Sequence, residues 1–347
     1  MNFLALDIGG AYTKSAFVGS GKNSVKILNT KRHAFNFRNN ANNLEHALID
    51  ELCSHIKDNK KIDIIIITIT AETVGIFNSI DDGVTKIASI CEKAFSEFKI
   101  CYVSTDGAIY DYKKLKANTI DFASANWVAT SELASNYIEN GLFIDMGSTT
   151  TDIIPIKNRA ICPTATTDMT RLISGELLYL GLLRTYISNI VNGLPFRDTF
   201  IPLAAELRCF TAHVYVALGF IDELEMLHPF SGNKIKITKA NSVDAIARSV
   251  CADTTLLNYD EIIKMGDYIY KEQMRKIIIS CNKIINHHWF YGADLRVIIT
   301  GSGSKIIENA VRFNKIGKII DSSNIFRDSE NATAVALSMM VNKHLKG

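Results

Sequence analysis

The sequence lacks the cysteine pairs and the long apolar runs that mark secreted and membrane proteins. Its seven cysteines are scattered, with no C-x-x-C pair and no Cys/His group at the spacing of zinc ligands. The apolar stretch of residues 64–69 is far shorter than the roughly 20 residues that a bilayer span requires, and no basic segment precedes the first apolar run. We therefore expect a cytoplasmic protein whose cysteines are mostly small core residues in a reducing compartment.

The chain also lacks runs of one charge, low-complexity segments and frequent prolines. The 347 residues include only five prolines. The formal net charge is +2, and without a basic run the sequence indicates binding neither to nucleic acid nor to anionic membranes. The first apolar run begins by Phe3, which leaves no room before it for a DNA-binding helix-turn-helix. With 47% hydrophobic residues, the length predicts about two globular domains that act on small molecules, with no nucleic-acid or membrane partner.

Apolar runs of strand length alternate with segments of helical periodicity, which predicts an α/β fold. We expect strands at residues 3–6, 64–69, 142–144, 153–156 and 297–299. The clearest helix follows Asn258 and Asp260, either of which can cap it, and ends near His287. The adjacent His287 and His288 point in different directions on a helix, so we expect no metal site there.

Two stretches, "LALDIGGAYTK" and "FIDMGSTTTDII", share one pattern. They align when shifted by 138 residues, so that an acid, a glycine and a threonine recur: Asp7, Gly9 and Thr13, then Asp145, Gly147 and Thr151. In each stretch an apolar strand ends in Asp, small residues make a tight turn, and a second strand returns. Such a turn presents backbone N–H groups and hydroxyls to phosphate oxygens, and the strand-end Asp can hold a divalent cation.

A third glycine turn lies in "VIITGSGSKI", where an apolar strand runs into Gly301, Ser302 and Gly303 before an expected helix. The glycines let the backbone come close to a ligand, and the helix N-terminus adds roughly half a positive charge. One glycine turn alone often serves only to permit a positive φ. The three turns together predict phosphate binding.

The order and spacing of these turns resemble those of the actin, sugar-kinase and Hsp70 superfamily. The two Asp turns are similar to its two phosphate loops, and "ITGSGS" to its adenosine-motif turn. The resemblance implies two ribonuclease-H-like domains that face a central phosphate-binding cleft. We place the first domain at residues 1–135, with a C-terminal helix at about 328–347 packing back on it, and the second at residues 136–327.

A closer resemblance rests on the segments "ITITAETVGIF", "DGVTKI", "ASANWVATSELA", "TTDMTRLISGELLYLGLLRT" and "AELRCFTAHVYVALG" together with the Asp turns. They resemble the archaeal and methylotroph hydantoinase-A-related family linked to one-carbon metabolism. The resemblance implies a transferase of methanofuran biosynthesis that requires Mg²⁺. In that reaction the phenol oxygen of γ-glutamyltyramine displaces diphosphate from (5-(aminomethyl)furan-3-yl)methyl diphosphate.

Within this hypothesis Asp7 and Asp145 hold the metal and take part in catalysis, and the three turns bind the diphosphate. The diphosphate-binding residues are then Gly9, Gly10, Thr13, Lys14, Gly147, Ser148, Thr149, Thr150, Thr151, Gly301, Ser302 and Gly303. These assignments have plain structural alternatives. Lys14 can be a solvated charge at a strand edge, and the run of hydroxyl residues can be an ordinary β-prone strand.

Glu72 follows a nearly continuous apolar strand, at the carboxyl end where open α/β sheets place their ligands. We interpret it as the general base for the phenol or a partner for the substrate amine, with an ordinary loop carboxylate as the alternative. Asp106 follows a strand in the same way, and we interpret it as a substrate-binding residue with the same alternative. The resemblance adds Asn126 and Glu176 as substrate-binding residues, and Arg171 as a ligand for the glutamyl carboxylates, although surface arginines are commoner.

Two other functions stay open. An ATP-dependent kinase, or an ATP-coupled hydrolase of the hydantoinase or oxoprolinase type, predicts nucleotide turnover, because ATP is the usual ligand of the superfamily. A non-catalytic nucleotide-binding regulator predicts binding alone. Tyr12 stands where we expect Asn in the related family, which leaves substrate detail open, and the sequence permits a homo-oligomer without indicating one.

Overall fold

The computed structural model describes residues 1–20, 25–57, 61–204, 209–228, 231–288, 290, 294–323, 325–326 and 331–344. Their contacts group the chain into two compact units. The first unit comprises residues 1–139, 156–171 and 323–347, and the second comprises residues 140–155 and 172–322. The predicted boundary had placed residues 156–171 in the second domain. The predicted helix at about 328–347 extends at both ends beyond the described residues.

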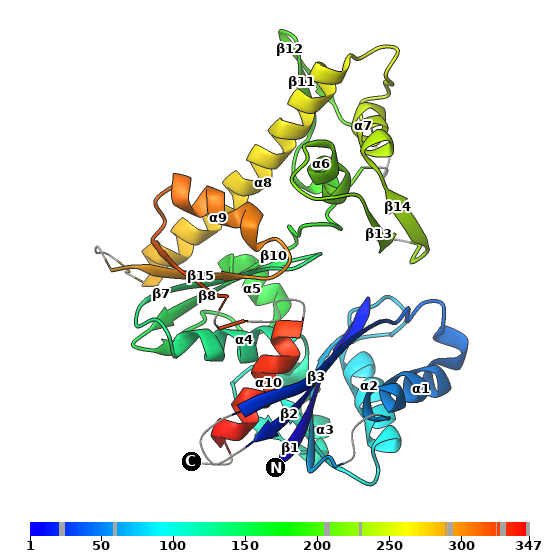
Figure 1. Cartoon of the computed structure of the whole chain (residues 1–347), viewed down its shortest axis with the longest axis vertical. Coiled ribbons are helices and arrows are strands. Elements are labelled where there is room, and N and C mark those ends of the chain that lie inside the picture. The colour runs from blue at the N-terminus through cyan, green and yellow to red at the C-terminus, as the bar shows by residue number, and fades with distance from the viewer. Residues whose placement is uncertain are drawn as a thin grey trace. The chain divides into compact units, whose positions relative to one another are not determined.

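The first unit is built on a six-stranded sheet with the order β3-β2-β1-β4-β5-β6 (Figure 1). Its strands are β1 (Asn2–Gly9), β2 (Tyr12–Ser20), β3 (Val25–Ala34), β4 (Ile64–Thr70), β5 (Lys99–Val103) and β6 (Ile109–Tyr110). The first three strands form an antiparallel meander, whereas β4 is parallel to β1 and β5 is parallel to β4. The carboxyl ends of β1 and β4 therefore lie at the same edge of the sheet.

Helices cover both faces of this sheet, which explains why β1 and β4 are nearly continuous apolar runs. The helices of the unit are α1 (Leu44–Ile56), α2 (Ile80–Ala94), α3 (Tyr112–Ala117), α4 (Asn126–Ser135) and α10 (Ala332–His344), with 3-10 turns at Ala41–Asn43 and Thr119–Phe122. Side chains of α1 and α2 pack on one face with Leu4, Leu6 and Ile65. Side chains of α10 and α4 pack on the other face with Phe3 and Ala5.

The second unit has a six-stranded sheet in which five strands follow the order β10-β8-β7-β15-β16 and β9 pairs with β8. Its strands are β7 (Gly141–Met146), β8 (Thr151–Lys157), β10 (Leu177–Leu178), β15 (Arg296–Thr300) and β16 (Lys318–Ile320), and β9 (Ala160–Ile161) pairs with the end of β8. As with β1, the strand that ends in an aspartate has its hairpin partner on one side and a parallel strand, β15, on the other. The two sheets thus repeat one strand order.

The remaining elements of the second unit are helices and two hairpins. They are α5 (Asp168–Ser174, which begins in the first unit), α6 (Thr211–Ala217), α7 (Lys239–Arg248), α8 (Tyr259–His288), α9 (Ser304–Phe313), the 3-10 turn Ile187–Asn189, and the strand pairs β11 (Gly193–Phe196) with β12 (Thr199–Pro202) and β13 (Leu224–Leu227) with β14 (Lys234–Ile237). Helix α8 is the long helix expected from the sequence. Asn258 caps it, because the Oδ1 of Asn258 accepts from the N–H of Glu261 over 3.0 Å.

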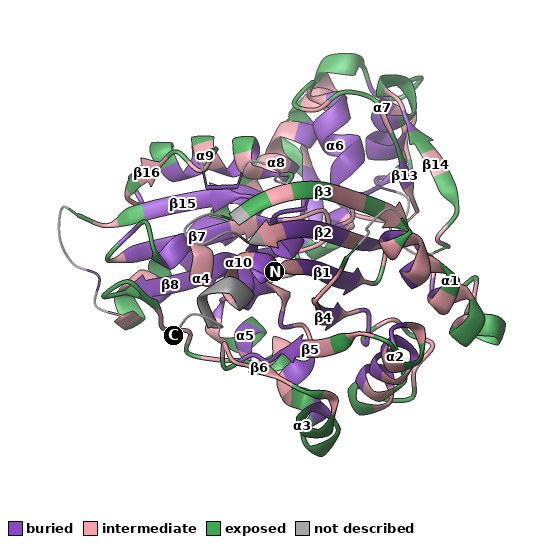
Figure 2. Ribbon diagram, turned by 60° about the horizontal axis from the view of Figure 1, so that its bottom comes forward, coloured by how far each residue is buried: buried purple, intermediate pink, exposed green. Residues whose placement is uncertain are grey.

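The five strands expected from the sequence are all present, and the α/β prediction is confirmed. Figure 2 shows the central strands β1, β2 and β15 as largely buried, in keeping with their apolar sequences. Within the described part of the chain, no helix combines the length and the apolar character needed to cross a bilayer.

Candidate functional site

The first glycine turn connects β1 to β2. Asp7 pairs with Lys14 across these strands, and residues 9–11 make the connection. Among the described residues, the backbone N–H groups of Gly10 and Ala11 have no hydrogen-bond acceptor. Adjacent N–H groups of this kind at the end of a strand pair suit an anion such as phosphate.

Asp7 is buried at the carboxyl end of β1, with only 3% of its surface exposed. Its Oδ2 lies 3.6 Å from the Nζ of Lys14, and the hydroxyl of Thr70 donates to its Oδ1 over 3.4 Å. Burial raises the pKa of the Asp7 carboxyl by more than the charge of Lys14 lowers it. The positive charge around Asp7 is too small to offset the cost of burying an ionised carboxylate. A hard divalent cation such as Mg²⁺, which prefers oxygen ligands, would supply the missing charge.

Glu72 lies two residues beyond the end of β4 and is also buried. The hydroxyl of Ser124 donates to its Oε1 over 2.6 Å and lies 3.1 Å from the Oδ2 of Asp168. Burial is the main cause that raises the pKa of Glu72 to about 7; the Ser124 hydrogen bond opposes it and the charge of Asp168 adds to it. Near neutral pH this carboxyl can therefore both accept and donate a proton, as a general acid–base group must.

Arg171 stacks on Trp127 and lies close to Asp168, the second partner of the Ser124 hydroxyl. The guanidinium carbon of Arg171 lies 4.4 Å from the centre of the Trp127 ring, and an Arg171 nitrogen lies 4.0 Å from the Oδ1 of Asp168. Both side chains are almost completely buried. Within the described part of the chain, the buried indole nitrogen of Trp127 has no hydrogen-bond partner, so this polar donor is left unused.

The second glycine turn connects β7 to β8 in the second unit. Its carbonyl groups point toward one segment of chain, since Gly147 accepts from Leu182 and Ser148 accepts from the N–H groups of residues 183 and 184, all over 2.9 Å. The backbone N–H groups of Ser148, Thr149 and Thr150 have no acceptor among the described residues. The turn is thus held from its carbonyl side while its N–H groups stay available to an anion.

Gly181 makes this packing possible. A Cβ at this position would lie 2.4 Å from the carbonyl carbon of Thr149, closer than any side chain tolerates. The Gly181 carbonyl is fixed in turn by the hydroxyl of Thr211 at 3.1 Å and the side chain of Gln273 at 3.0 Å. Neighbouring elements of the second unit therefore set the position of the turn.

The third glycine turn packs against Asp145. Gly301 has a φ of 86°, and a Cβ there would collide with the Asp145 carboxylate, 2.3 Å from its Oδ1, and with the Met146 carbonyl, 2.4 Å from its oxygen. The N–H of Gly303 donates to the Met146 carbonyl over 2.9 Å, and α9 begins at the next residue. The structure therefore brings the second and third predicted turns together at the carboxyl ends of the parallel strands β7 and β15. The buried hydroxyl of Thr300 there has no partner among the described residues.

Two predicted site residues, Thr13 and Thr151, are fully buried. The hydroxyl of Thr13 has no partner among the described residues, whereas the hydroxyl of Thr151 donates to the Leu180 carbonyl over 2.6 Å. This contact holds the segment around residue 180 against the second turn. Thr151 therefore has a positioning role in the structure, and its contact with diphosphate stays a prediction.

The predicted substrate-binding residues lie in different environments. Asp106 is exposed and accepts from the N–H of Ala108 and the hydroxyl of Tyr110 within its own hairpin, which is the plain alternative for this residue. Asn126 is the first residue of α4, two residues after Ser124. Glu176 is completely buried, and its carbonyl accepts from Ile153. A nitrogen of Arg171 lies 4.0 Å from the Asp168 carboxylate, and the burial of Arg171 excludes the alternative of a surface arginine. Its contact with the glutamyl carboxylates stays a prediction.

Ser124 and Asp168 were not predicted as site residues. They lie in segments that resemble the related family, but Ser124 is 52 residues from Glu72 and Asp168 is 44 residues from Ser124. Ser124 has a φ of 51°, which is uncommon for serine, and its N–H donates to the Ile69 carbonyl over 3.0 Å. No periodic pattern in the sequence encodes that conformation.

A pocket of about 520 Å³ lies elsewhere in the second unit, between the β11–β12 hairpin and α8. Phe200, Tyr268 and Arg275 contribute to its lining. It contains none of the predicted site residues, so we place the candidate site at the strand ends and not in this pocket.

Comparison with known proteins gives a consistent family signal. A model of the Hydantoinase/oxoprolinase family matches residues 67–344. The chain is 28% identical over 309 residues to (4-{4-[2-(gamma-L-glutamylamino)ethyl]phenoxymethyl}furan-2-yl)methanamine synthase of Methanocaldococcus jannaschii, covering 89% of this chain and 88% of that protein. It is 32% identical over 179 residues to the Methanococcus vannielii protein of the same name, covering 52% of this chain and 78% of the other.

A solved structure shows the same fold at low identity. The nucleotide-free structure of acetone carboxylase, an enzyme of ATP-dependent acetone carboxylation, superposes with a TM-score of 0.59 at 10% identity. The match covers 97% of this chain and 70% of the acetone carboxylase chain. At this identity the likeness shows a shared architecture and does not identify a ligand.

Proposed function

Because the chain belongs to the hydantoinase/oxoprolinase family, we propose that it is a transferase of methanofuran biosynthesis. It would condense (5-(aminomethyl)furan-3-yl)methyl diphosphate with γ-glutamyltyramine through an ether bond and release diphosphate. The observation that carries this proposal is the similarity over 89% of the chain to a synthase whose name describes that ether product.

The geometry of the two Asp turns supports a diphosphate substrate. Each turn has backbone N–H groups without acceptors among the described residues, and each lies beside a strand-end aspartate. When the bond between the furanylmethyl carbon and the diphosphate oxygen breaks, the electron pair goes to that oxygen. Preorganised N–H groups stabilise this developing charge more than they stabilise the bound substrate.

The oxygen ligands of Asp7 and Asp145 fit Mg²⁺, which we propose as the cofactor. When bound, Mg²⁺ would offset the negative charge of the diphosphate. Lys14 lies close enough to Asp7 to add a further positive charge, and Gly301 leaves the space that the Asp145 carboxylate occupies. These residues would hold the leaving group while the carbon–oxygen bond breaks.

Glu72 is our candidate for the general base. In its ionised form the carboxylate would take the proton of the phenol as the phenol oxygen forms its bond to the furanylmethyl carbon. A carboxyl with a pKa of about 7 accepts a proton from a phenol of pKa about 10 more readily than an ordinary glutamate does. Ser124 would hold the orientation of Glu72.

Substrate incubation tests the proposed reaction against the ATP-dependent alternatives. Purified protein with Mg²⁺ receives both organic substrates, each substrate alone, or ATP alone, and released pyrophosphate and phosphate are measured. Pyrophosphate formed only when both organic substrates are present supports the condensation. Turnover of ATP without any condensation would contradict it and favour the kinase or hydrolase alternative, whereas ATP binding without turnover would favour a regulator.

A further inference from the structure

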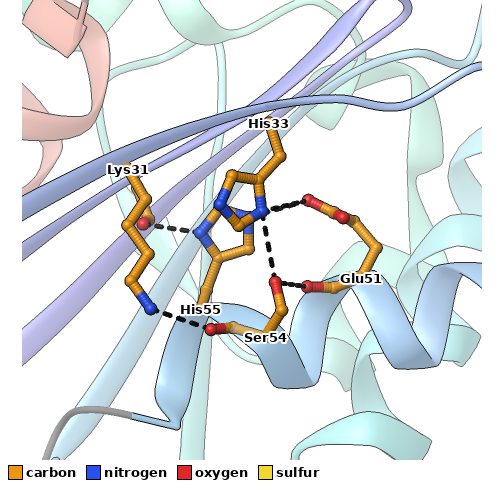
Figure 3. A network of polar contacts seen from close by, with 6 residues as sticks. Lys31, His33, Glu51, Ser54 and His55 are labelled. Atoms are coloured by element: carbon orange, nitrogen blue, oxygen red, sulfur yellow. Dashed lines mark hydrogen bonds and ion pairs between the residues drawn. The ribbon is translucent and has the colours of Figure 1, made fainter.

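A cluster of two histidines and a glutamate lies in the first unit, away from the residues assigned to the proposed reaction. His33 is on β3, whereas Glu51 and His55 are one turn apart on α1 (Figure 3). One potential ligand atom from each of the three side chains lies within 4.8 Å of the other two. The helix supplies two of the groups at i and i+4, and strand pairing brings in the third.

The three groups converge on one point. The Oε1 of Glu51 lies 3.0 Å from the Nε2 of His55 and 3.1 Å from the Nδ1 of His33. Ligand atoms on a tetrahedral Zn²⁺, each about 2.0–2.1 Å from the metal, are roughly 3.3 Å apart. Small side-chain rotations therefore suffice to place all three atoms around one ion, and the partial exposure of His33 leaves a side open for the ion and for a water ligand.

The surroundings orient the imidazole of His55 as second-shell groups do in metal sites. His55 is completely buried, and its Nδ1 lies 2.7 Å from the hydroxyl of Ser15 on β2, which leaves Nε2 directed at Glu51. The ammonium group of Lys31, also on β3, donates to the Ser54 carbonyl over 2.9 Å. Figure 3 shows this contact of Lys31 with the backbone of α1 beside the cluster.

The donor set of the cluster suits a transition-metal cation. Two nitrogen ligands and one carboxylate are the donor set of zinc sites and are a poor match for Mg²⁺ or Ca²⁺, which prefer oxygen ligands.

We propose that His33, Glu51 and His55 form a site for a borderline transition-metal ion, with Zn²⁺ as the expected occupant. The bound ion would join α1 to β3 directly and to β2 through Ser15, and so fasten the antiparallel half of the sheet to the helix that covers it. Its role would be to stabilise the first unit. This inference does not depend on the proposed reaction.

Zinc binding to the full chain tests the site. The protein is stripped with a chelator, and Zn²⁺ alone is then titrated while heat release and thermal unfolding are measured. We expect one high-affinity equivalent per chain and a rise in melting temperature. His33→Gln and Glu51→Gln should each weaken the binding at least tenfold, and Ser15→Ala should weaken it by about 10- to 100-fold.

His46→Gln is the matched control, because His46 is an exposed histidine on the same helix and should leave binding unchanged. Cys53→Ser tests whether the Cys53 thiol, which lies on the same helix, is a zinc ligand, and this variant should also leave binding unchanged. Since His33 is at the surface and Glu51→Gln conserves shape, circular dichroism of these variants before metal addition separates folding from binding. No high-affinity equivalent, undiminished binding in His33→Gln and Glu51→Gln, or loss in Cys53→Ser alone would each overturn the proposed ligand set.

Discussion

Replacement of Glu72 by glutamine should change how the stability of the first unit depends on pH. The glutamine keeps the size and polarity of the side chain but cannot ionise. In the folded protein, burial raises the pKa of the Glu72 carboxyl from its ordinary 4.5 to about 7. The folded state therefore holds the proton more tightly than the unfolded chain does.

The size of the effect follows from the two pKa values. Each tenfold difference in proton affinity is worth about 1.4 kcal/mol, so the difference between 4.5 and about 7 corresponds to about 3 kcal/mol. The stabilising contribution of the protonated carboxyl is complete below pH 4.5 and is lost as the pH rises through 7. Relative to Glu72→Gln, the native protein should thus lose about 3 kcal/mol of stability between these pH values.

Trp127 gives a local probe for the measurement. The chain has two tryptophans, and a Trp289→Phe background leaves Trp127 as the reporter for the first unit. Urea unfolding of this background, with and without Glu72→Gln, is followed by fluorescence from pH 4.5 to pH 8. The difference in the free energy of unfolding between the two proteins cancels the contributions of other titrating groups. One such group is His213, whose pKa is lowered by burial to about 4.

If the free energy of unfolding depends on pH in the same way with and without Glu72→Gln, the conclusion that the folded state binds a proton on Glu72 is wrong. Glu97→Gln replaces an exposed carboxylate of the same unit and should leave the curve unchanged. If Glu72 is also the general base, Glu72→Gln should lower kcat by about 10²- to 10⁴-fold. The activity of the native protein should then rise as the pH passes through about 7.

Asp7→Asn and Asp145→Asn should each reduce Mg²⁺-dependent turnover by about a hundredfold or more with the fold intact, and full activity in either variant would remove that residue from the metal site. Gly301→Ala should destabilise the second unit by about 1–3 kcal/mol and impair turnover, because the backbone conformation is left-handed and the added methyl collides with the Asp145 carboxylate; an unchanged melting curve would contradict this packing. Arg171→Met should cost about 2 kcal/mol and shift the emission of Trp127, since the guanidinium lies 4.4 Å from the indole ring; an unaltered emission spectrum would argue against that stacking.

The strands and the glycine turns were predictable because their signals are local. Consecutive apolar residues predict a buried strand, and an aspartate followed by glycine and hydroxyl residues indicates where that strand ends. The duplicated pattern at Asp7 and Asp145 therefore gave both strand-end positions correctly. Strand order also explains the contact between Gly301 and Asp145, although only the structure shows how close it is.

The partners of Glu72 were not predictable in this way. Ser124 and Asp168 reach the carboxyl group through tertiary packing and an uncommon backbone conformation, neither of which leaves a periodic signal. The cluster around Glu51 is similar. The spacing of Glu51 and His55 on a helix can be read from the sequence, but His33 joins them only through the packing of β3 on α1. The contact of the Thr151 hydroxyl with the Leu180 carbonyl likewise depends on tertiary packing that the sequence does not show.

The central claim is that this chain forms an ether with diphosphate as the leaving group. The most direct measurement quantifies the coupled product by mass spectrometry and pyrophosphate by an enzymatic assay in the same reaction, with Mg²⁺ and both organic substrates. We predict that the two products appear in equal amounts, and that Asp145→Asn suppresses both while Asp222→Asn, at an exposed position of the same unit, suppresses neither. Pyrophosphate without coupled product, or no turnover of the furan diphosphate by well-folded protein, would contradict the claim.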